Sequence, residues 1–220
     1  LLLTLTAKIG VTMLVGSFRE ALSNWLEIRL SADIYLQNDS VSEASIIESD
    51  VVGWHVASHQ RIGVSTRWFD RPAIVQGVDV DAPDITGLEL AEQTSNGLAN
   101  WRNSAEGLLD PQPILANEQV KHLGHVNLGD VISLQASGTA YDYEIVGFFH
   151  DYGTPYYRFY LPAEMVEGRW QNVRSEGLSL WVISGGLEDA ERSMLAAGAE
   201  QGEWIRQADI KRVSLEIFDR

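Results

Sequence analysis

The chain has 220 residues, with 31 acidic and 16 basic side chains, a formal charge of −15 and no cysteine. This length and a hydrophobic content of 45% exclude wholesale disorder and allow one large domain or two small ones. The negative charge argues against nucleic acid and anionic lipid as main partners, and the lack of cysteine excludes disulfide scaffolds, thiolate zinc sites and cysteine nucleophiles.

The first thirty residues predict a single helix whose two halves differ. Residues 1–16 form an apolar run whose only charged residue is Lys8, but they are fewer than the roughly 20 residues that cross a bilayer. Beyond them, Phe18, Leu22 and Trp25 recur with helical spacing and predict an amphipathic face. This combination is typical of a helix that leaves a membrane and docks on a folded domain, although a buried helix of a soluble protein would share its first half.

The last residues predict a second helix of the same kind. Asp209 can cap it, and Ile210, Val213 and Ile217 follow at the spacing of one helical face. No glycine or proline stop signal follows them. We therefore expect this helix to continue toward the membrane, and the chain to be the part of a larger protein that lies between two membrane segments.

Between these helices the first half of the chain predicts strands, short helices and one long polar stretch. Strands are expected where β-branched and apolar residues cluster, and turns where glycine, proline and asparagine do. The expected strands are 33–36, 51–65 with a bend at Gly53, and 72–80, and the expected helices lie at 40–49, at 88–92 and around Trp101. Residues 81–109 are rich in glycine, asparagine and aspartate, and loops of this length are uncommon unless functional or mobile.

After Pro111 and Pro113 the chain becomes richer in strands. Asn117 can cap a helix that runs to His122. The other expected elements are strands at 114–116, 131–134, 142–149, 157–161, 178–183 and 203–207 and a helix at 187–197. Because the order strand–helix–strand occurs at both ends with a β-rich block between, we expect a discontinuous domain that holds an inserted one.

The histidines do not predict a metal or catalytic site. His55 and His59 lack the glutamate of a zinc-protease motif, and a strand would place them about 13 Å apart. His122 and His125 are expected at a helix end, where imidazole groups can bind carbonyl oxygens. A phosphate-binding loop, a dinucleotide fingerprint and a nucleophile elbow are absent from the sequence. We therefore expect no catalytic, cofactor-binding or metal-binding residues.

The aspartates Asp79, Asp81 and Asp84 are as dense as those of a calcium loop but are not spaced like them. Pro83 occupies the third ligand position, and the glycine and closing glutamate are missing. We interpret these residues as a solvated acidic loop. Paired carboxylates are common in so acidic a chain, so no pair predicts a general acid and base.

Residues 148–160 contain seven aromatic side chains. Alternation along a strand sends Phe148 and Phe149 to opposite faces, so both cannot pack into one core. One interpretation is a surface that recognises a partner or cargo, made by Phe149, Tyr152, Tyr156 and Tyr157. The other is a small aromatic core, and the sequence leaves both open. Asp151 and Gly153 are expected to set the turn.

Three stretches occur in the order found in one known family. They are VGSFREALSNWLEIRLSADIYL from Val15, PILANEQVKHLGHVNLGDVISL from Pro113 and YEIVGFFHDYGT from Tyr143. The first resembles a segment between a membrane helix and a first strand, the second a strand, helix and Gly-Asp turn, and the third a strand that ends in an Asp-Tyr-Gly turn. The set is similar to the FtsX-like permeases of ABC transporters, whose extracytoplasmic region is the MacB-type periplasmic core domain.

This resemblance implies an α+β fold in which a small β-rich subdomain is inserted into a porter-like βαβ subdomain. The porter-like subdomain would comprise 31–110 and 168–207, and the insertion 111–167. Segments 1–30 and 208–220 would lead to the first and second transmembrane helices. The side chains expected on these coupling helices are Phe18, Leu22, Trp25, Ile210, Val213 and Ile217.

The resemblance further implies a protein of the bacterial inner membrane, with this region in the periplasm. The region would not be an enzyme, since ATP hydrolysis would belong to a cytoplasmic ABC ATPase subunit, and the permease would pair with a second copy. It would transmit ATP-driven motion and recognise a lipoprotein, a peptide or a periplasmic protein, with no cofactor and no nucleic acid. The residues alone leave two alternatives: a single-span ligand-binding or sensor domain, and an extracytoplasmic hydrolase with paired carboxylates.

Overall fold

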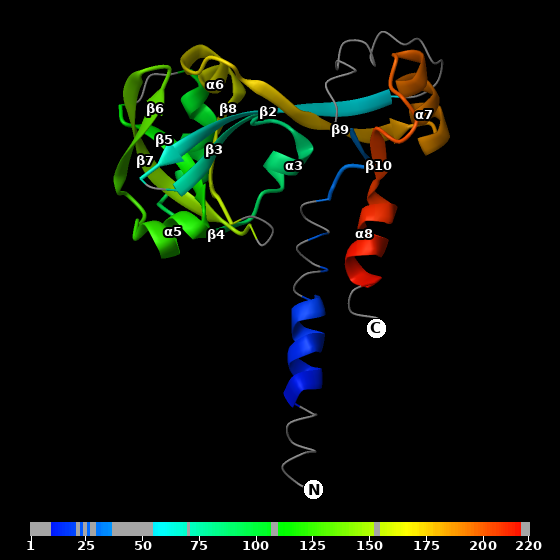
Figure 1. Ribbon diagram of the computed structural model, residues 1–220, viewed down its shortest axis with the longest axis horizontal. Helices are drawn as coiled ribbons and strands as arrows, with labels where there is room; N and C mark the ends of the chain where they lie inside the picture. The colour runs from blue at the N-terminus through cyan, green and yellow to red at the C-terminus, as the bar shows by residue number, and fades with distance from the viewer. Residues whose placement is uncertain are drawn as a thin grey trace, which may run out of the picture.

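The computed structural model describes residues 10–20, 23, 26, 30–36, 55–69, 71–106, 110–151 and 155–216, with only the backbone for 55–60, 105–106 and 215–216. The chain is a mixed α+β structure with one ten-stranded sheet, in the order β10-β1-β9-β2-β3-β8-β5-β7-β4, and β6 also pairs with β7. Strands β2 (His55–Trp68) and β9 (Arg174–Ser184) run from a smaller lobe into a larger one and join the two (Figure 1).

The smaller lobe is built around a very short central strand. Strand β1 (Ile34–Leu36) lies between β9 and β10 (Trp204–Arg206) and is antiparallel to both. Side chains that alternate along β1 and β9 share one face, where they pack against Ala190 and Met194 of helix α7 (Leu187–Ala196). Asp189 accepts a hydrogen bond from the Gly186 backbone N–H at 3.0 Å and so caps the start of α7.

The larger lobe holds the remaining six strands. Two of its pairings, β3·β8 and β5·β7, are parallel, and the others are antiparallel. Parallel partners require a crossover connection, which between β5 and β7 contains a helix and β6. The strands are β3 (Arg71–Val78), β4 (Leu90–Gln93), β5 (Gln112–Asn117), β6 (Val131–Ala136), β7 (Thr139–Phe149) and β8 (Tyr157–Pro162).

Short helices cover the strands of the larger lobe (Figure 1). Trp101 is fully buried, and its indole N–H donates to the Tyr160 carbonyl at 2.9 Å, which fixes one of these helices to β8. The helices are α3 (Pro83–Thr86), α4 (Gly97–Arg102) followed by the 3-10 turn η1 (Asn103–Glu106), α5 (Glu118–Gly124) and α6 (Ala163–Arg169).

The larger lobe has a hydrophobic cluster on each face of its sheet. Phe148 belongs to the first cluster and Phe149 to the second, and both side chains are fully buried. This separation confirms the prediction that the two rings point to opposite faces. The first cluster combines side chains of β2 and β3 with side chains of β5 to β8. The proposed division into 31–110 with 168–207 and an insertion at 111–167 stays a prediction.

Most expected strands are present, but the stretch 81–109 differs from its prediction. The helix expected at 88–92 is wrong, because Leu90–Gln93 is the edge strand β4 and pairs with β7. A helix is found earlier, at Pro83–Thr86, where a proline occupies its first turn. The helix expected around Trp101 is confirmed. The helix expected at 40–49 and the bend expected at Gly53 lie outside the described residues.

Two helix starts also differ from the sequence interpretation. Asn117 stands at the cap position of α5 but makes no capping bond, because its side chain donates to the Tyr156 carbonyl at 2.9 Å and accepts from the Arg158 N–H at 3.1 Å. The last helix, α8 (Gln207–Glu216), begins two residues before Asp209. Asp209 therefore lies inside its first turn, where it pairs with Arg212 at 3.0 Å.

Residues 10–20 form a helix that projects away from both lobes (Figure 1). Among the described residues, no helix combines the length and the hydropathy of a membrane span.

Candidate functional site

The candidate site is the place where the two terminal segments meet the smaller lobe. We call it the helix junction and define it as residues 30–36, strand β10 and the first turn of α8. Strand β10 ends at Arg206 and α8 begins at Gln207, so no linker separates the edge strand from the helix. Any displacement of α8 therefore acts directly on the sheet.

Asp33 is the center of the backbone contacts in the helix junction. Its N–H donates to the Leu180 carbonyl at 2.9 Å, and its own carbonyl accepts from the Gln207 N–H at 2.9 Å. Its carboxylate oxygen Oδ2 accepts from the Val182 N–H at 2.8 Å. The Gln207 side chain also donates to the Leu30 carbonyl. One residue thus joins the incoming segment to strand β9 and to the outgoing helix.

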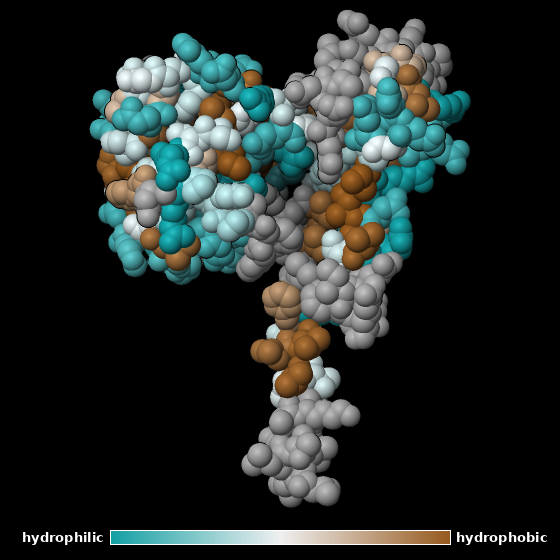
Figure 2. Space-filling model, in the orientation of Figure 1, coloured by the Kyte–Doolittle hydropathy of each residue, from teal (hydrophilic) through white to brown (hydrophobic). Residues whose placement is uncertain are grey.

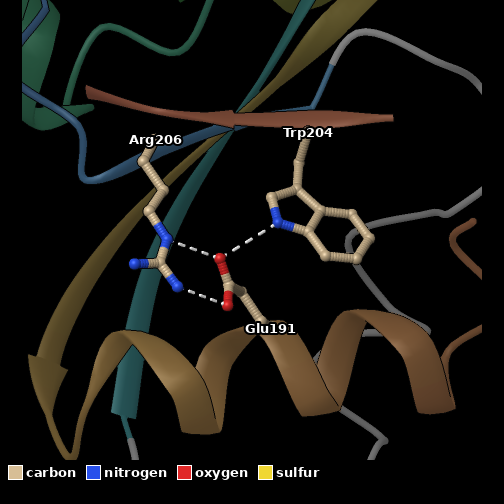
Figure 3. Close-up of polar contacts among 3 residues, drawn as sticks. All are labelled: Glu191, Trp204 and Arg206. Atoms are coloured by element: carbon tan, nitrogen blue, oxygen red, sulfur yellow. Dashed lines mark hydrogen bonds and ion pairs between the residues drawn. The ribbon is translucent and has the colours of Figure 1, made fainter. Parts of the chain in front are cut away.

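Glu191 of α7 binds the outgoing segment from the other side (Figure 3). Nε and Nη2 of Arg206 donate to its two carboxylate oxygens at 2.7 Å each, and the Trp204 indole N–H donates to Oε1 at 3.2 Å. The hydrogen bonds from Arg206 lower the pKa of Glu191, against an opposing effect of desolvation. The paired geometry is the bidentate arrangement that gives arginine–carboxylate contacts their directionality.

A hollow of about 430 Å³ lies beside this ion pair, lined by residues of α7, β10 and α8. Its polar lining includes Glu191, Arg206 and Asp209. In the described part of the chain, no group of three or more histidine, aspartate or glutamate side chains is placed to hold a metal ion. The arrangement joins the outgoing segment to α7 and, through Gln207 and Asp33, to the sheet.

The predicted coupling side chains are only partly described. Phe18 and Val213 are both 57% exposed, and Ile210 is half-buried. The helix that carries Phe18 projects away from both lobes (Figure 1). Leu22, Trp25 and Ile217 lie outside the described residues. Among the described residues of this segment, Leu26 is buried, with 6% exposure, as expected from its place on the same predicted helical stripe.

For two of the four predicted recognition residues the prediction was wrong, because their side chains are buried. Phe149 is fully buried and Tyr157 is 3% exposed, so neither contributes to a surface. The reason is that β7 and β8 have a core on each face, and Phe149 stacks on Tyr160 with ring centroids 4.3 Å apart. Tyr156 is 43% exposed and stays a candidate.

The turn between β7 and β8 is only partly described, since Tyr152 and Gly153 lie outside the described residues. Asp151 is buried, and its carboxylate pairs with Nη1 of Arg158 at 3.4 Å. It therefore ties the end of β7 to β8 in addition to any role in the turn.

The predicted histidine positions are described in part. His122 lies in the last turn of α5, and His125 follows as its C-cap with φ 54°. The side chains of His55 and His59 lie outside the described residues, although their backbone belongs to β2.

Sequence reasoning missed the main members of the helix junction, Asp33, Glu191 and Arg206. Glu191 and Arg206 are 15 positions apart on different elements, and no spacing rule connects such a pair. Asp33 offered a weak signal, since a lone aspartate directly before a buried strand is well placed to accept backbone N–H groups.

Comparison with known proteins gives one match in sequence and several in structure. No protein-family model matches the chain. An uncharacterized ABC transporter permease protein of Mycobacterium tuberculosis is 23% identical over 238 aligned positions, which cover all of this chain and 27% of the relative. The chain thus spans about a quarter of the length of this relative.

Two solved structures are similar to the chain at low identity. The periplasmic region of MacB from Actinobacillus actinomycetemcomitans has a TM-score of 0.46 and 14% identity, and covers 82% of this chain and 90% of its own. The extracellular domain of the ABC-type transporter YknZ from Gram-positive bacteria has a TM-score of 0.40 and 14% identity, and covers 80% of this chain and 98% of its own. The chain is thus similar in sequence to part of an ABC transporter permease protein and, at low identity, to the extracytoplasmic regions of MacB and YknZ.

Proposed function

We propose that this chain is the extracytoplasmic domain of an FtsX-like ABC transporter permease and that it carries ATP-driven motion from the membrane to a partner outside. The observation that carries the proposal is the helix junction, where Asp33 binds the incoming segment, the sheet and the outgoing helix together. Both terminal helices leave the smaller lobe on the same side (Figure 1). A relative movement of two membrane helices would therefore reach the domain at one point.

The helix at residues 10–20 supports a membrane connection on physical grounds. Five of its large apolar side chains are between 44% and 71% exposed, namely Val11, Met13, Leu14, Val15 and Phe18. Figure 2 shows these apolar side chains gathered on the projecting helix, away from both lobes. An exposed apolar surface of this kind marks contact with a membrane or another protein. We infer that the helix continues a transmembrane segment.

The route for the motion would run through the sheet. Strand β10 pairs with β1, β1 pairs with β9, and β9 pairs along its length with β2, which reaches the larger lobe. Hydrogen-bonded strands move as a unit more readily than segments joined by loops. The larger lobe would then present the partner surface, with a cytoplasmic ATPase subunit and a second permease copy completing the transporter in the bacterial inner membrane.

The direct test is co-purification of the full-length protein in detergent. A cytoplasmic ATPase subunit should co-purify with it, and its ATP hydrolysis should change when the permease is present. A full-length protein with no associated ATPase and a single membrane span would overturn the proposal and favour a tethered sensor domain.

A second test measures the helix junction itself. Because this chain contains no cysteine, Phe18→Cys and Val213→Cys introduce the only spin-labelling sites within it, and any cysteine elsewhere in the full-length protein is first replaced by serine. We expect a narrow distance distribution that shifts when the associated ATPase binds ATP. Asp33→Ala removes the acceptor for the Val182 N–H and should broaden the distribution, whereas Asp33→Asn keeps an acceptor oxygen and should not. Identical distributions in all three proteins would show that Asp33 does not hold the helices.

A further inference from the structure

A groove lies in the larger lobe between two unpaired strand edges. We call it the β6 groove and define it by Trp68 and Phe69 at the tip of the β2–β3 hairpin, residues 124–126 after α5, and residues 130–133 at the start of β6. Its volume is about 520 Å³. Strand β6 pairs with β7 alone, and β2 pairs with β9 no further than Gly63. The strands of the lobe therefore do not close into a barrel at this point.

The register of the β6–β7 hairpin shows which backbone groups of β6 face the groove. Asp130 accepts from the Ile145 N–H at 2.9 Å, so the backbone groups of the even-numbered β6 residues point toward β7. Those of Val131 and Ser133 consequently point away from β7, into the groove. Among the described residues, no hydrogen bond to these four N–H and C=O groups is found.

The other half of the same edge is closed. The Trp170 indole N–H donates to the Gln135 carbonyl at 3.1 Å, and the Gln171 N–H donates to Oγ of Ser137 at 2.8 Å. Natural sheets protect their free edges in this way, because an open edge pairs with other chains. Val131 and Ser133 are thus a short open stretch in an edge that is otherwise covered.

Phe69 lines the groove and has a backbone conformation that is unfavourable for phenylalanine. It has φ 52° in the two-residue connection between Trp68 and Arg71, is 74% exposed, and lies with its ring centroid 4.5 Å from that of Trp68. Such positions favour glycine or asparagine, and a bulky side chain at positive φ is strained. An exposed aromatic ring beside a groove offers a large apolar contact area to a bound chain.

The charges beside the groove favour a basic occupant. Asp130 lies in the lining, and Asp142, which accepts a hydrogen bond from the Ser133 hydroxyl, and Glu144 stand across β6 on β7, one strand away from the groove. No lysine or arginine is part of the described lining. An added strand that carries lysine or arginine would meet carboxylates along its path.

We propose that the β6 groove binds an extended, basic peptide segment of a partner protein, which adds as a strand to β6 at Val131 and Ser133. The occupant would form main-chain hydrogen bonds with this edge, place apolar side chains against Phe69 and Val131, and place basic side chains near the carboxylates. The proposal rests on the geometry of the larger lobe and goes beyond the proposed function, because it holds whether or not the chain belongs to a transporter.

The test uses the full chain, immobilised, and a phage-displayed library of random dodecapeptides. The selected peptides are synthesised, and their affinity is measured for the wild type and two variants. Ser133→Pro removes the N–H that faces the groove and should weaken binding at least about tenfold, since edge strands tolerate proline. Ser133→Ala keeps that N–H but removes the hydroxyl that donates to Asp142, so it should retain clearly more affinity than Ser133→Pro. Amide exchange at Val131 and Ser133 should slow when the peptide is bound.

Further variants of the peptide and of the protein separate the contributions of main-chain hydrogen bonds, charge and Phe69 to binding. A peptide N-methylated at alternate residues should lose binding, and binding should weaken with added salt. Phe69→Asn, which suits the positive φ, should weaken binding while raising the unfolding temperature. The proposal would be overturned if no selected peptide slows amide exchange at Val131 and Ser133, or if Ser133→Pro binds the peptide as tightly as the wild type does. It would also be overturned if β6 pairs with β6 of a second copy in a concentration-dependent dimer. None of these results depends on whether an ATPase co-purifies.

Discussion

The two lobes share one sheet, but each has its own core, and the two cores are made of different kinds of side chain. The larger lobe packs aromatic rings on both faces of its strands, with Trp101, Tyr143, Phe148, Phe149 and Phe159 all fully buried. The hydrophobic cluster of the smaller lobe consists of isoleucine, leucine, alanine and methionine on one face of β1 and β9, whereas the buried ring of Tyr35 lies on the other face of β1. Large rings bury more apolar area per residue. We therefore expect packed rings to contribute more to the stability of the larger lobe, and the hydrogen bonds and ion pair of the helix junction to contribute relatively more to that of the smaller lobe.

The connection between the lobes lies where β2 and β9 lose their regular register. A bulge occurs between Arg61 and Ile62, opposite Gly177. Gly177 has φ 123°, and a Cβ there would approach the Leu36 carbonyl oxygen to 2.6 Å, so this position requires glycine. Bulges bend a strand and increase its twist. One continuous pair of strands can therefore serve two separate cores.

The largest expected effect comes from the core of the larger lobe. Trp101→Ala removes a fully buried ring and leaves the Tyr160 carbonyl without its donor. It should lower the free energy of unfolding by about 3–5 kcal/mol, measured by denaturant titration. Trp101→Phe keeps most of the volume and should cost clearly less. Equal losses for the two variants would show that ring packing does not dominate this core.

Met194→Ala in the smaller lobe should have a smaller and more local effect. Met194 is fully buried between α7 and the sheet, and its truncation should cost about 2–4 kcal/mol. Because the clusters of the two lobes are separate, hydrogen exchange should accelerate for β1 and for the half of β9 beside it, but not for β7 and β8. Uniform acceleration in all four strands would mean that the lobes unfold as one unit.

The smallest expected effect is at the ion pair of the helix junction, and it depends on pH. Glu191 has a lowered pKa in the folded protein, so its stabilising contribution is complete above the unfolded-state value of 4.5 and is lost as pH falls through the lower folded-state value. Glu191→Gln should reduce the unfolding temperature by about 2–4 °C at pH 7, and the difference should disappear at strongly acidic pH. Glu167→Gln, at an exposed position of α6, is the control and should change little. A difference that persists in acid would exclude the ion pair as its cause.

Local patterns were sufficient for the described strands other than β4 and for the direction of the aromatic rings. Phe148 and Phe149 point to opposite faces because side chains alternate on any strand, whatever lies around it. The same pattern could not tell whether Phe149 and Tyr157 would be exposed. Their burial depends on helices and strands that arrive from distant parts of the chain, such as α4 with Trp101.

The sequence by itself determined the α+β class, the aromatic concentration at 148–160 and the resemblance to an ABC transporter permease, because these follow from residue order and local periodicity. The tertiary structure alone decided that Leu90–Gln93 is a strand, since β7 provides the hydrogen bonds that its polar residues could not predict. It also decided that Asp33 and Glu191 hold the terminal segments and that β6 keeps a short open edge. Long-range pairing determines these features, and no spacing along the chain encodes which distant strand or helix will supply the partner.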